Sequence, residues 1–297
     1  MKKIQIILMA VLLAAGAGYS AVLVNATFET DTVGVGPGVP ATGTAAIFKP
    51  VQTAATVTNS VKVTATGPGS GQAVRVLDDA QAQASYLEYN FAASSNAQKS
   101  AISFSFALSQ TLMGDQNATN GVMRMSVGQY STDSSTILSS TTKMAAQFGL
   151  DSAGVLRAYN NGNATTVATF ASGSSHTLAM YLNDNNTSWA QYNVSGTDYN
   201  LAGNSVDYWV DGSRVLSGAS LQLAMAIVDT NGVAGTIATS EASLGRIGFG
   251  VGTAPFGMDV TLDNIQVADI SVIPEPATMG MLLLGAVTVL AVRRRRA

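Results

Sequence analysis

The chain has 297 residues, a formal net charge of −3, one histidine and no cysteine, which excludes disulfides and zinc sites built on thiolates. Residues 21–270 alone carry nine basic and seventeen acidic side chains, a net charge of −8, because basic residues at the two ends offset this excess. Such an acidic stretch excludes nucleic acid as a partner, since binding to phosphates needs a basic surface.

The chain opens with the features of an export signal. A basic start (residues 1–3) precedes an apolar run, Ile4–Ala15, and then a stretch of small residues. This order predicts a signal peptide over residues 1–20, a helix that is removed on export. Cleavage after Ser20 and cleavage after Ala17 both satisfy the preference for small residues at the cleavage site.

Residues 21–270 contain short runs in which apolar and polar residues alternate, the pattern of β-strands with one buried face. In Ser100–Leu108 the apolar residues at every second position share one face. Further runs of this kind are Tyr86–Phe91, His176–Asn183 and Leu221–Val228. Asn161-Gly162 and Asp211-Gly212 predict two-residue hairpin turns, because these residue types tolerate positive φ. The pattern predicts one all-β domain of antiparallel sheets.

The residue types needed for polysaccharide chemistry are spread along the chain. Glycosidases need two carboxylates across one cleft, whereas Glu29, Glu88 and Glu241 are far apart in the sequence. His176, the single histidine, stands at the start of a predicted strand, where a half-solvated structural role is favoured over that of a general base. No catalytic residue is therefore predicted. An enzyme would be recognised by two carboxylates about 5–10 Å apart on a concave sheet.

Aromatic side chains are most frequent in residues 188–210, and exposed aromatic rings are typical of sugar-binding sites. The candidate glycan contacts are Trp189, Tyr192, Tyr208 and Trp209. Neighbouring members of this set point to opposite sides of a strand, so some of them belong to the core.

Two polar segments offer oxygen ligands for Ca²⁺, Leu77–Ala80 and Asn183–Ser188. Neither follows the spacing of a calcium hand, and both suit ordinary polar turns. The prediction is therefore that the protein has no metal ligand and no cofactor, with Ca²⁺ as the alternative.

The chain ends in an apolar run followed by four arginines. Ala277–Val292 has sixteen residues without charge, about 24 Å as a helix at ~1.5 Å per residue, against a bilayer core of ~30 Å. It predicts a slightly short transmembrane helix, whose reach the arginine stems extend. The cluster Arg293, Arg294, Arg295 and Arg296 keeps the C-terminus in the cytoplasm and the preceding residues outside.

Pro274, Glu275 and Pro276, followed by this run and the arginines, resemble a PEP-CTERM sorting signal covering residues 271–297. Such signals occur on exported proteins of Gram-negative bacteria. The resemblance implies recognition by an exosortase, a membrane-embedded enzyme similar to transpeptidases, while the helix lies in the inner membrane. It also implies cleavage near residues 274–276 and transfer to the cell surface or an exopolysaccharide matrix. A permanent C-terminal membrane anchor is the alternative.

Several segments of residues 21–270 resemble concanavalin A-like and laminin-G-like jelly rolls. They are Ala26–Pro37, Ser175–Asn183, Val206–Val215 and Phe256–Ile270. The resemblance implies a two-sheet antiparallel jelly-roll sandwich between the signal helix and the transmembrane helix. Lectins, glycosidases, lyases and structural modules all use such a fold, so it does not define an activity.

The two sorting signals and the missing catalytic constellation predict a non-enzymatic protein. It would be a structural or adhesive module at the cell surface or in the extracellular matrix, with exopolysaccharide as its candidate ligand. A glycosidase or lyase on the same fold is the alternative.

Overall fold

The computed structural model describes residues 21–38, 59–68, 71–78, 86–94, 97–112, 122–130, 144–160, 163–185, 188–221, 244–250 and 258–274. Every regular element named within these ranges is a β-strand. No helix in them is long and apolar enough to cross a membrane. The predicted signal peptide (1–20) and transmembrane helix (277–292) lie outside the described residues.

The larger of the two main sheets has eight strands. Its order is β14 (Ser213–Ser220), β13 (Ser205–Val210), β10 (Ser175–Asn183), β5 (Ala101–Thr111), β16 (Met258–Asp269), β3 (Ala73–Asp78) and β2 (Asn59–Thr64). The eighth strand, β1 (Val22–Ala26), pairs with β16 over residues 265–268, whereas β3 pairs with β16 over residues 258–262. The two strands therefore share one edge of β16.

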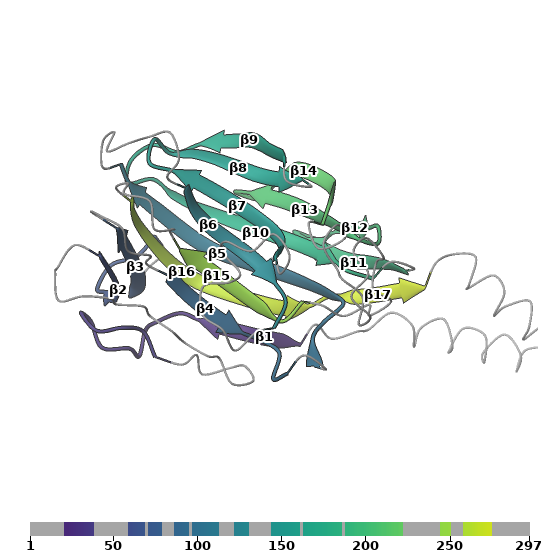
Figure 1. Ribbon diagram of the computed structural model, residues 1–297, viewed down its shortest axis with the longest axis horizontal. Coiled ribbons are helices and arrows are strands. Elements are labelled where there is room, and N and C mark those ends of the chain that lie inside the picture. The colour runs from purple at the N-terminus through teal and green to yellow at the C-terminus, as the bar shows by residue number, and fades with distance from the viewer. Residues whose placement is uncertain are drawn as a thin grey trace, which may run out of the picture.

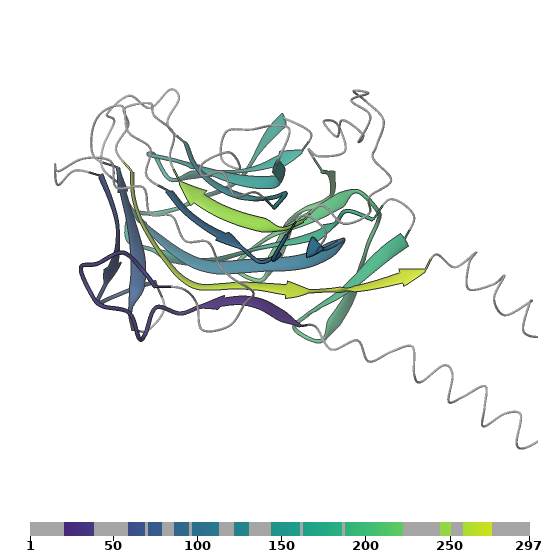
Figure 2. The same ribbon diagram turned by 60° about the horizontal axis from the view of Figure 1, so that its bottom comes forward.

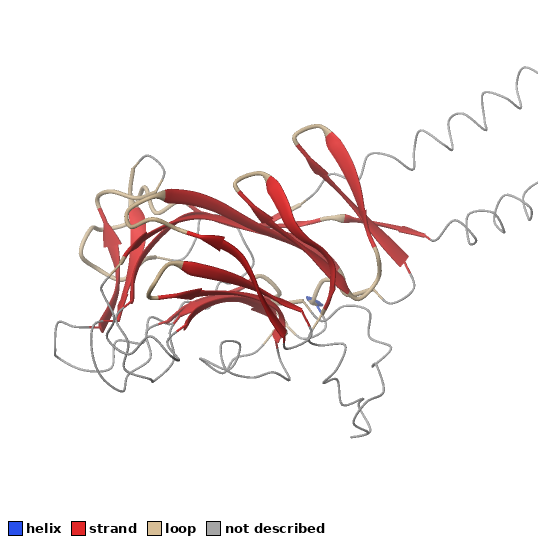
Figure 3. Ribbon diagram, turned by 90° about the horizontal axis from the view of Figure 1, so that it is seen from above, coloured by secondary structure: helices blue, strands red, loops and turns tan. Residues whose placement is uncertain are grey.

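The second main sheet has six strands and the third sheet has three. The six-stranded order is β4 (Tyr86–Asn90), β15 (Arg246–Gly250), β6 (Val122–Gly128), β7 (Met144–Asp151), β8 (Val155–Asn160) and β9 (Asn163–Thr169). The small sheet consists of β12 (Thr197–Leu201), β11 (Ser188–Val194) and β17 (Ser271–Pro274). Figure 1 labels these strands, and Figures 2 and 3 show the main sheets as two curved layers.

Alternating side chains build the core between the two main sheets. Every second residue of β5 from Ile102 to Leu108 is at most 1% exposed. Phe104 and Phe106 contact Phe249 of β15 edge-on, with ring centroids 5.6 and 5.0 Å apart. Burial of such rings is a major source of stability in a sandwich that lacks disulfides. The fold is an all-β, two-sheet antiparallel jelly-roll sandwich, as expected.

The predicted strands agree with the structure where it describes them. Tyr86–Phe91, Ser100–Leu108 and His176–Asn183 correspond to β4, β5 and β10. The predicted strand Leu221–Val228 lies outside the described residues except for Leu221.

One of the two predicted hairpin turns is described. Asp211 and Gly212 have φ values of 49° and 73° and connect β13 to β14, whose ladder ends at the pair Val210 and Ser213. The predicted turn Asn161-Gly162 lies outside the described residues, between the paired residues Asn160 and Asn163.

Candidate functional site

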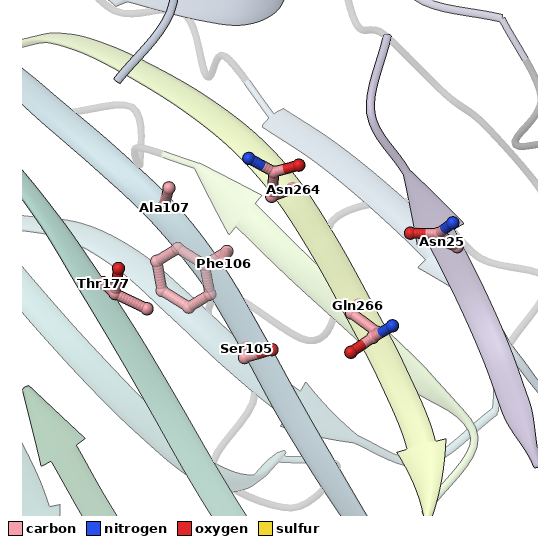
Figure 4. Close-up of a pocket in the computed structure, with 7 residues that line it drawn as sticks. All are labelled: Asn25, Ser105, Phe106, Ala107, Thr177, Asn264 and Gln266. Carbon is pink, nitrogen blue, oxygen red and sulfur yellow. The ribbon is translucent and has the colours of Figure 1, made fainter. Parts of the chain in front are cut away.

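A hollow of about 350 Å³ lies on the face of the eight-stranded sheet that points away from the core. Its lining residues come from β1, β5, β10 and β16 (Figure 4). They are Asn25, Ser105, Phe106, Ala107, Thr177, Asn264 and Gln266. The side chains of β5 that face it, Ser105 and Ala107, alternate with core phenylalanines, which places the hollow on the outer face.

An irregularity in β16 accounts for the hollow. The register of β16 against β5 shifts between Asp263 and Gln266, the signature of a β-bulge. Asn264 has a φ of 50°, a left-handed conformation that asparagine tolerates better than most residues. The edge partner of β16 changes from β3 to β1 at the same place. The sheet is therefore locally open, and the small side chains of β5 do not fill the space.

Asp263 stabilises the bulge through hydrogen bonds to its neighbour Asn264. Its side chain is 1% exposed, and its two oxygens accept hydrogen bonds from the backbone N–H of Asn264 (2.6 Å) and from Asn264 Nδ2 (3.2 Å). Burial raises the pKa of Asp263, the backbone N–H of Asn264 acts in the opposite direction, and the negative charge of Glu29 raises it further. These bonds hold the Asn264 amide at the rim of the hollow.

The lining is uncharged and rich in hydrogen-bonding groups. Asn25, Asn264 and Gln266 each offer an amide donor and acceptor, and Ser105 and Thr177 add hydroxyls. Phe106 is 1% exposed, so its ring belongs to the core and offers no stacking face. This set suits a neutral ligand with many hydroxyl groups and offers no ion pair to a charged one.

The aromatic residues predicted to contact glycans lie mainly in cores. Tyr208 is 0% exposed in the main core, and Tyr192 and Trp209 are 4% and 5% exposed in a second, smaller core. The smaller core forms because residues of β11 and β12 pack on outward-facing side chains of β10 and β13. Rings covered in this way present no free face to a sugar, so the prediction was wrong for these three. Trp189, at 38% exposed, keeps its candidate role.

The polar groups of the smaller core are also satisfied internally. Asp207 Oδ2 accepts hydrogen bonds from Tyr192 Oη (2.5 Å) and Arg214 Nη1 (3.2 Å), and its Oδ1 accepts one from the N–H of Gly218 (2.6 Å). Trp209 Nε1 donates to Tyr192 Oη at 3.2 Å. Burial raises the pKa of Tyr192, and the hydrogen bond to Asp207 adds to the shift. The cluster therefore braces the small sheet.

His176 lies in an arrangement that sequence spacing did not reveal. Its Nε2 is 2.7 Å from Ser174 Oγ, and its Nδ1 is 2.7 Å from Asp211 Oδ2, the atom order of a hydrolase triad. However, Ser174 Oγ also donates to the carbonyl of Ala171 at 2.6 Å, and a hydroxyl has only one proton to give.

The surroundings of His176 favour a structural role. Its ring stacks on Phe170 with centroids 3.8 Å apart, and Asp211 Oδ1 accepts the N–H of Thr177 at 2.8 Å. We conclude that the group ties the turn between β13 and β14 to the start of β10. The Asp-Gly turn was the available signal, but only the pairing of β10 with β13 brings it to His176.

Within the described residues, Glu88 and Asp151 do not form a glycosidase pair across the six-stranded sheet. Glu88 pairs there with Arg246 at 3.3 Å, and both side chains are buried. Asp151, at the end of β7, pairs with Arg157 at 2.9 Å. β15 and β6 lie between β4 and β7, so β4 and β7 are about 14 Å apart at ~4.8 Å per strand. This distance exceeds the separation of the two catalytic carboxylates in glycosidases.

The remaining glutamates and the Ca²⁺ segments add no site in the described residues. Glu29 accepts the N–H of Gln72 at 3.3 Å, and Glu241 lies outside the described ranges. Those ranges hold no group of three or more histidine, aspartate or glutamate side chains placed to bind a metal. Both predicted Ca²⁺ segments are described only in part, and Asn183 uses its Nδ2 to donate to the carbonyls of Ser188, Leu201 and Ala202.

The sorting signal meets the folded domain at β17. Pro274 is the last residue of this strand, while Glu275, Pro276 and the arginines 293–296 lie outside the described residues. Residues 272–296 match the family model described as PEP-CTERM protein-sorting motif. The chain therefore carries this motif, which implies a secreted, exosortase-sorted protein with a C-terminal membrane anchor before processing.

Comparison with curated proteins finds no match. Among solved structures, a sialidase is similar with 13% identity and a TM-score of 0.44, over 72% of this chain and 16% of that chain. The catalytic domain of a glycoside hydrolase family 131 protein from Coprinopsis cinerea has 9% identity and a TM-score of 0.46, over 83% of this chain and 93% of that chain. The Emp47p carbohydrate recognition domain has 11% identity and a TM-score of 0.43, over 86% of this chain and 99% of that chain. These likenesses do not decide between an enzyme and a binding module.

Proposed function

We propose that this protein is a non-enzymatic adhesive module of the cell surface or extracellular matrix, which binds neutral polysaccharide in the hollow beside the β16 bulge. One observation carries the proposal: an accessible hollow lined by three amides and two hydroxyls, without a charged side chain. Amides and hydroxyls supply the paired donors and acceptors that sugar hydroxyls require. The sorting motif supports the location, because it directs the chain out of the cell.

Retention on polysaccharide tests the proposal. The full chain, purified in detergent, should be retained by a neutral polysaccharide such as dextran or galactomannan more strongly than by anionic alginate. Asn25→Ala combined with Gln266→Ala removes two amides, each hydrogen bond being worth about 1 kcal/mol, so affinity should fall about tenfold or more. Gln191→Ala removes an exposed amide of β11 outside the hollow and serves as the control.

Two results would contradict the proposal. One is that no neutral polysaccharide retains the wild-type chain. The other is that Asn25→Ala/Gln266→Ala binds as tightly as Gln191→Ala. Cleavage of the polysaccharide by the wild-type chain would contradict the non-enzymatic part alone.

A further inference from the structure

The sorting motif begins inside a strand of the folded domain. The motif covers residues 272–296, and β17 covers Ser271–Pro274. β17 pairs antiparallel with β11 through four residue pairs, from Gln191 with Ser271 to Ser188 with Pro274. The first residues of the signal are therefore paired to the domain that the signal delivers.

The strand that receives β17 is held firmly. Tyr192 of β11 stacks on Tyr181 of β10, with ring centroids 3.8 Å apart. Its hydroxyl bonds to buried Asp207, and Ala190 beside it is fully buried. The β11–β12 hairpin is thus fixed to the outer face of the eight-stranded sheet.

The chain that enters β17 is anchored as well. The N–H of Asp269 donates to the carbonyl of Ala21 at 2.9 Å, and its carboxylate pairs with Lys99 at 2.9 Å. The N–H of Ile270 donates to the carbonyl of Ala101 at 3.3 Å. Residues up to 270 therefore stay with the main sheet, and only β17 is free to separate without opening it.

The length of the chain sets how closely the domain approaches the membrane. The predicted membrane span starts at residue 277, three residues after Pro274. Three residues reach at most about 10 Å when fully extended. If β17 leaves β11, the tether runs from Ile270 and its seven residues reach about 23 Å. A processing enzyme that binds residues on both sides of the cut as an extended strand needs this longer segment.

We infer that β17 has to leave β11 before the exosortase cleaves the chain, so that the β11–β12 hairpin controls processing of the sorting signal. This inference rests on cleavage near residues 274–276, which the sorting motif implies. It assigns the hairpin a positioning role in processing that is separate from glycan binding.

A disulfide between the two strands tests the inference. The chain has no cysteine, so Trp189→Cys with Ile273→Cys introduces a single pair at directly opposed positions near the end of β17. The matched control is Gln191→Cys with Asn200→Cys, which links β11 to β12 at opposed, exposed positions and leaves β17 free. Both chains are expressed in bacteria that carry an exosortase, and mass spectrometry follows loss of the C-terminal arginines.

The expected result is at least a tenfold drop in the processed fraction for the disulfide-linked form of Trp189→Cys/Ile273→Cys, reversed by reductant, and normal processing of the control. Processing of the oxidised Trp189→Cys/Ile273→Cys chain at the control rate would overturn the inference and leave the sorting role intact. An intact arginine tail on the wild-type chain and the control would instead refute processing itself, and the inference with it.

Discussion

Tyr192 illustrates what decides the role of a single aromatic residue. Its position between polar residues of β11 is compatible with an exposed sugar-binding ring. In the structure its ring lies against Tyr181 and its hydroxyl bonds to Asp207. Period-two alternation predicts which residues share a face of a strand, but not whether another sheet covers that face.

At this scale we predict that Tyr192→Phe lowers the free energy of unfolding by about 1.5–3 kcal/mol, the range for a hydrogen bond to a charged group. The phenyl ring would keep the stacking contact, while buried Asp207 would lose one donor and Trp209 Nε1 its acceptor. Urea unfolding of the full chain measures the change.

Tyr199→Phe is the control, because the Tyr199 ring belongs to the same cluster and its hydroxyl makes no hydrogen bond in the described structure. Equal unfolding free energies for Tyr192→Phe and the wild type would show that the hydroxyl does not brace the small sheet.

At the scale of an element, the β16 bulge is a feature that the residues of its own strand do not predict. The run around Asp263 and Asn264 predicts a strand, and the strand is present as β16. The bulge depends on β16 exchanging its partner β3 for β1, strands that lie near the other end of the sequence. Such pairing over a long sequence distance leaves no local signal, so the hollow was not predicted.

We predict that Asn264→Val destabilises the protein by about 1–2 kcal/mol more than Asn264→Gly, because a β-branched residue is strained at a φ of 50° whereas glycine is not. Both variants lack the amide at the rim of the hollow, so both should bind neutral polysaccharide less tightly. Unfolding curves and polysaccharide retention of the two variants check this. Equal stability of the two variants would mean that the left-handed conformation at residue 264 is not required.

At the scale of the whole molecule, the two ends of the described chain lie at the same end of the sandwich (Figure 1). The carbonyl of Ala21 accepts the N–H of Asp269, and Val22 pairs with Ala268. Either predicted signal-peptide cleavage leaves β1 intact. The start of β1 and the end of β16, the strand that leads to the sorting motif, are therefore bonded to each other at one end of the sandwich.

Buried tyrosines predict how the stability of the whole domain depends on pH. Burial raises the pKa of Tyr89 and Tyr208 above the ordinary value of 10.0. Their stabilising effect is complete below pH 10 and is lost as the pH rises, since above it the unfolded chain loses protons that the folded chain keeps. Above pH 10 the free energy of unfolding should therefore fall by about 1.4 kcal/mol per pH unit for each of these two tyrosines.

Urea unfolding between pH 8 and pH 11 measures this slope. Tyr89→Phe is the informative variant, because the Tyr89 hydroxyl is buried without a hydrogen-bond partner. Tyr89→Phe should leave the free energy of unfolding at pH 8 nearly unchanged. Above pH 10 this free energy should fall less steeply with pH than in the wild type, by the contribution of one tyrosine. A slope identical to that of the wild type would contradict the prediction.

The sequence by itself determined the all-β class, the strands β4, β5 and β10, the hairpin at Asp211-Gly212 and the sorting motif at the C-terminus. These features depend on neighbouring residues, through period-two alternation, turn conformation and the order of short motifs. Tertiary structure alone decided that Tyr192 of β11 and Trp209 of β13 join a second core and that a bulge opens an uncharged hollow. It also decided that the sorting motif starts within a paired strand. These features depend on which distant strands meet, because burial and register are properties of the assembled sheets.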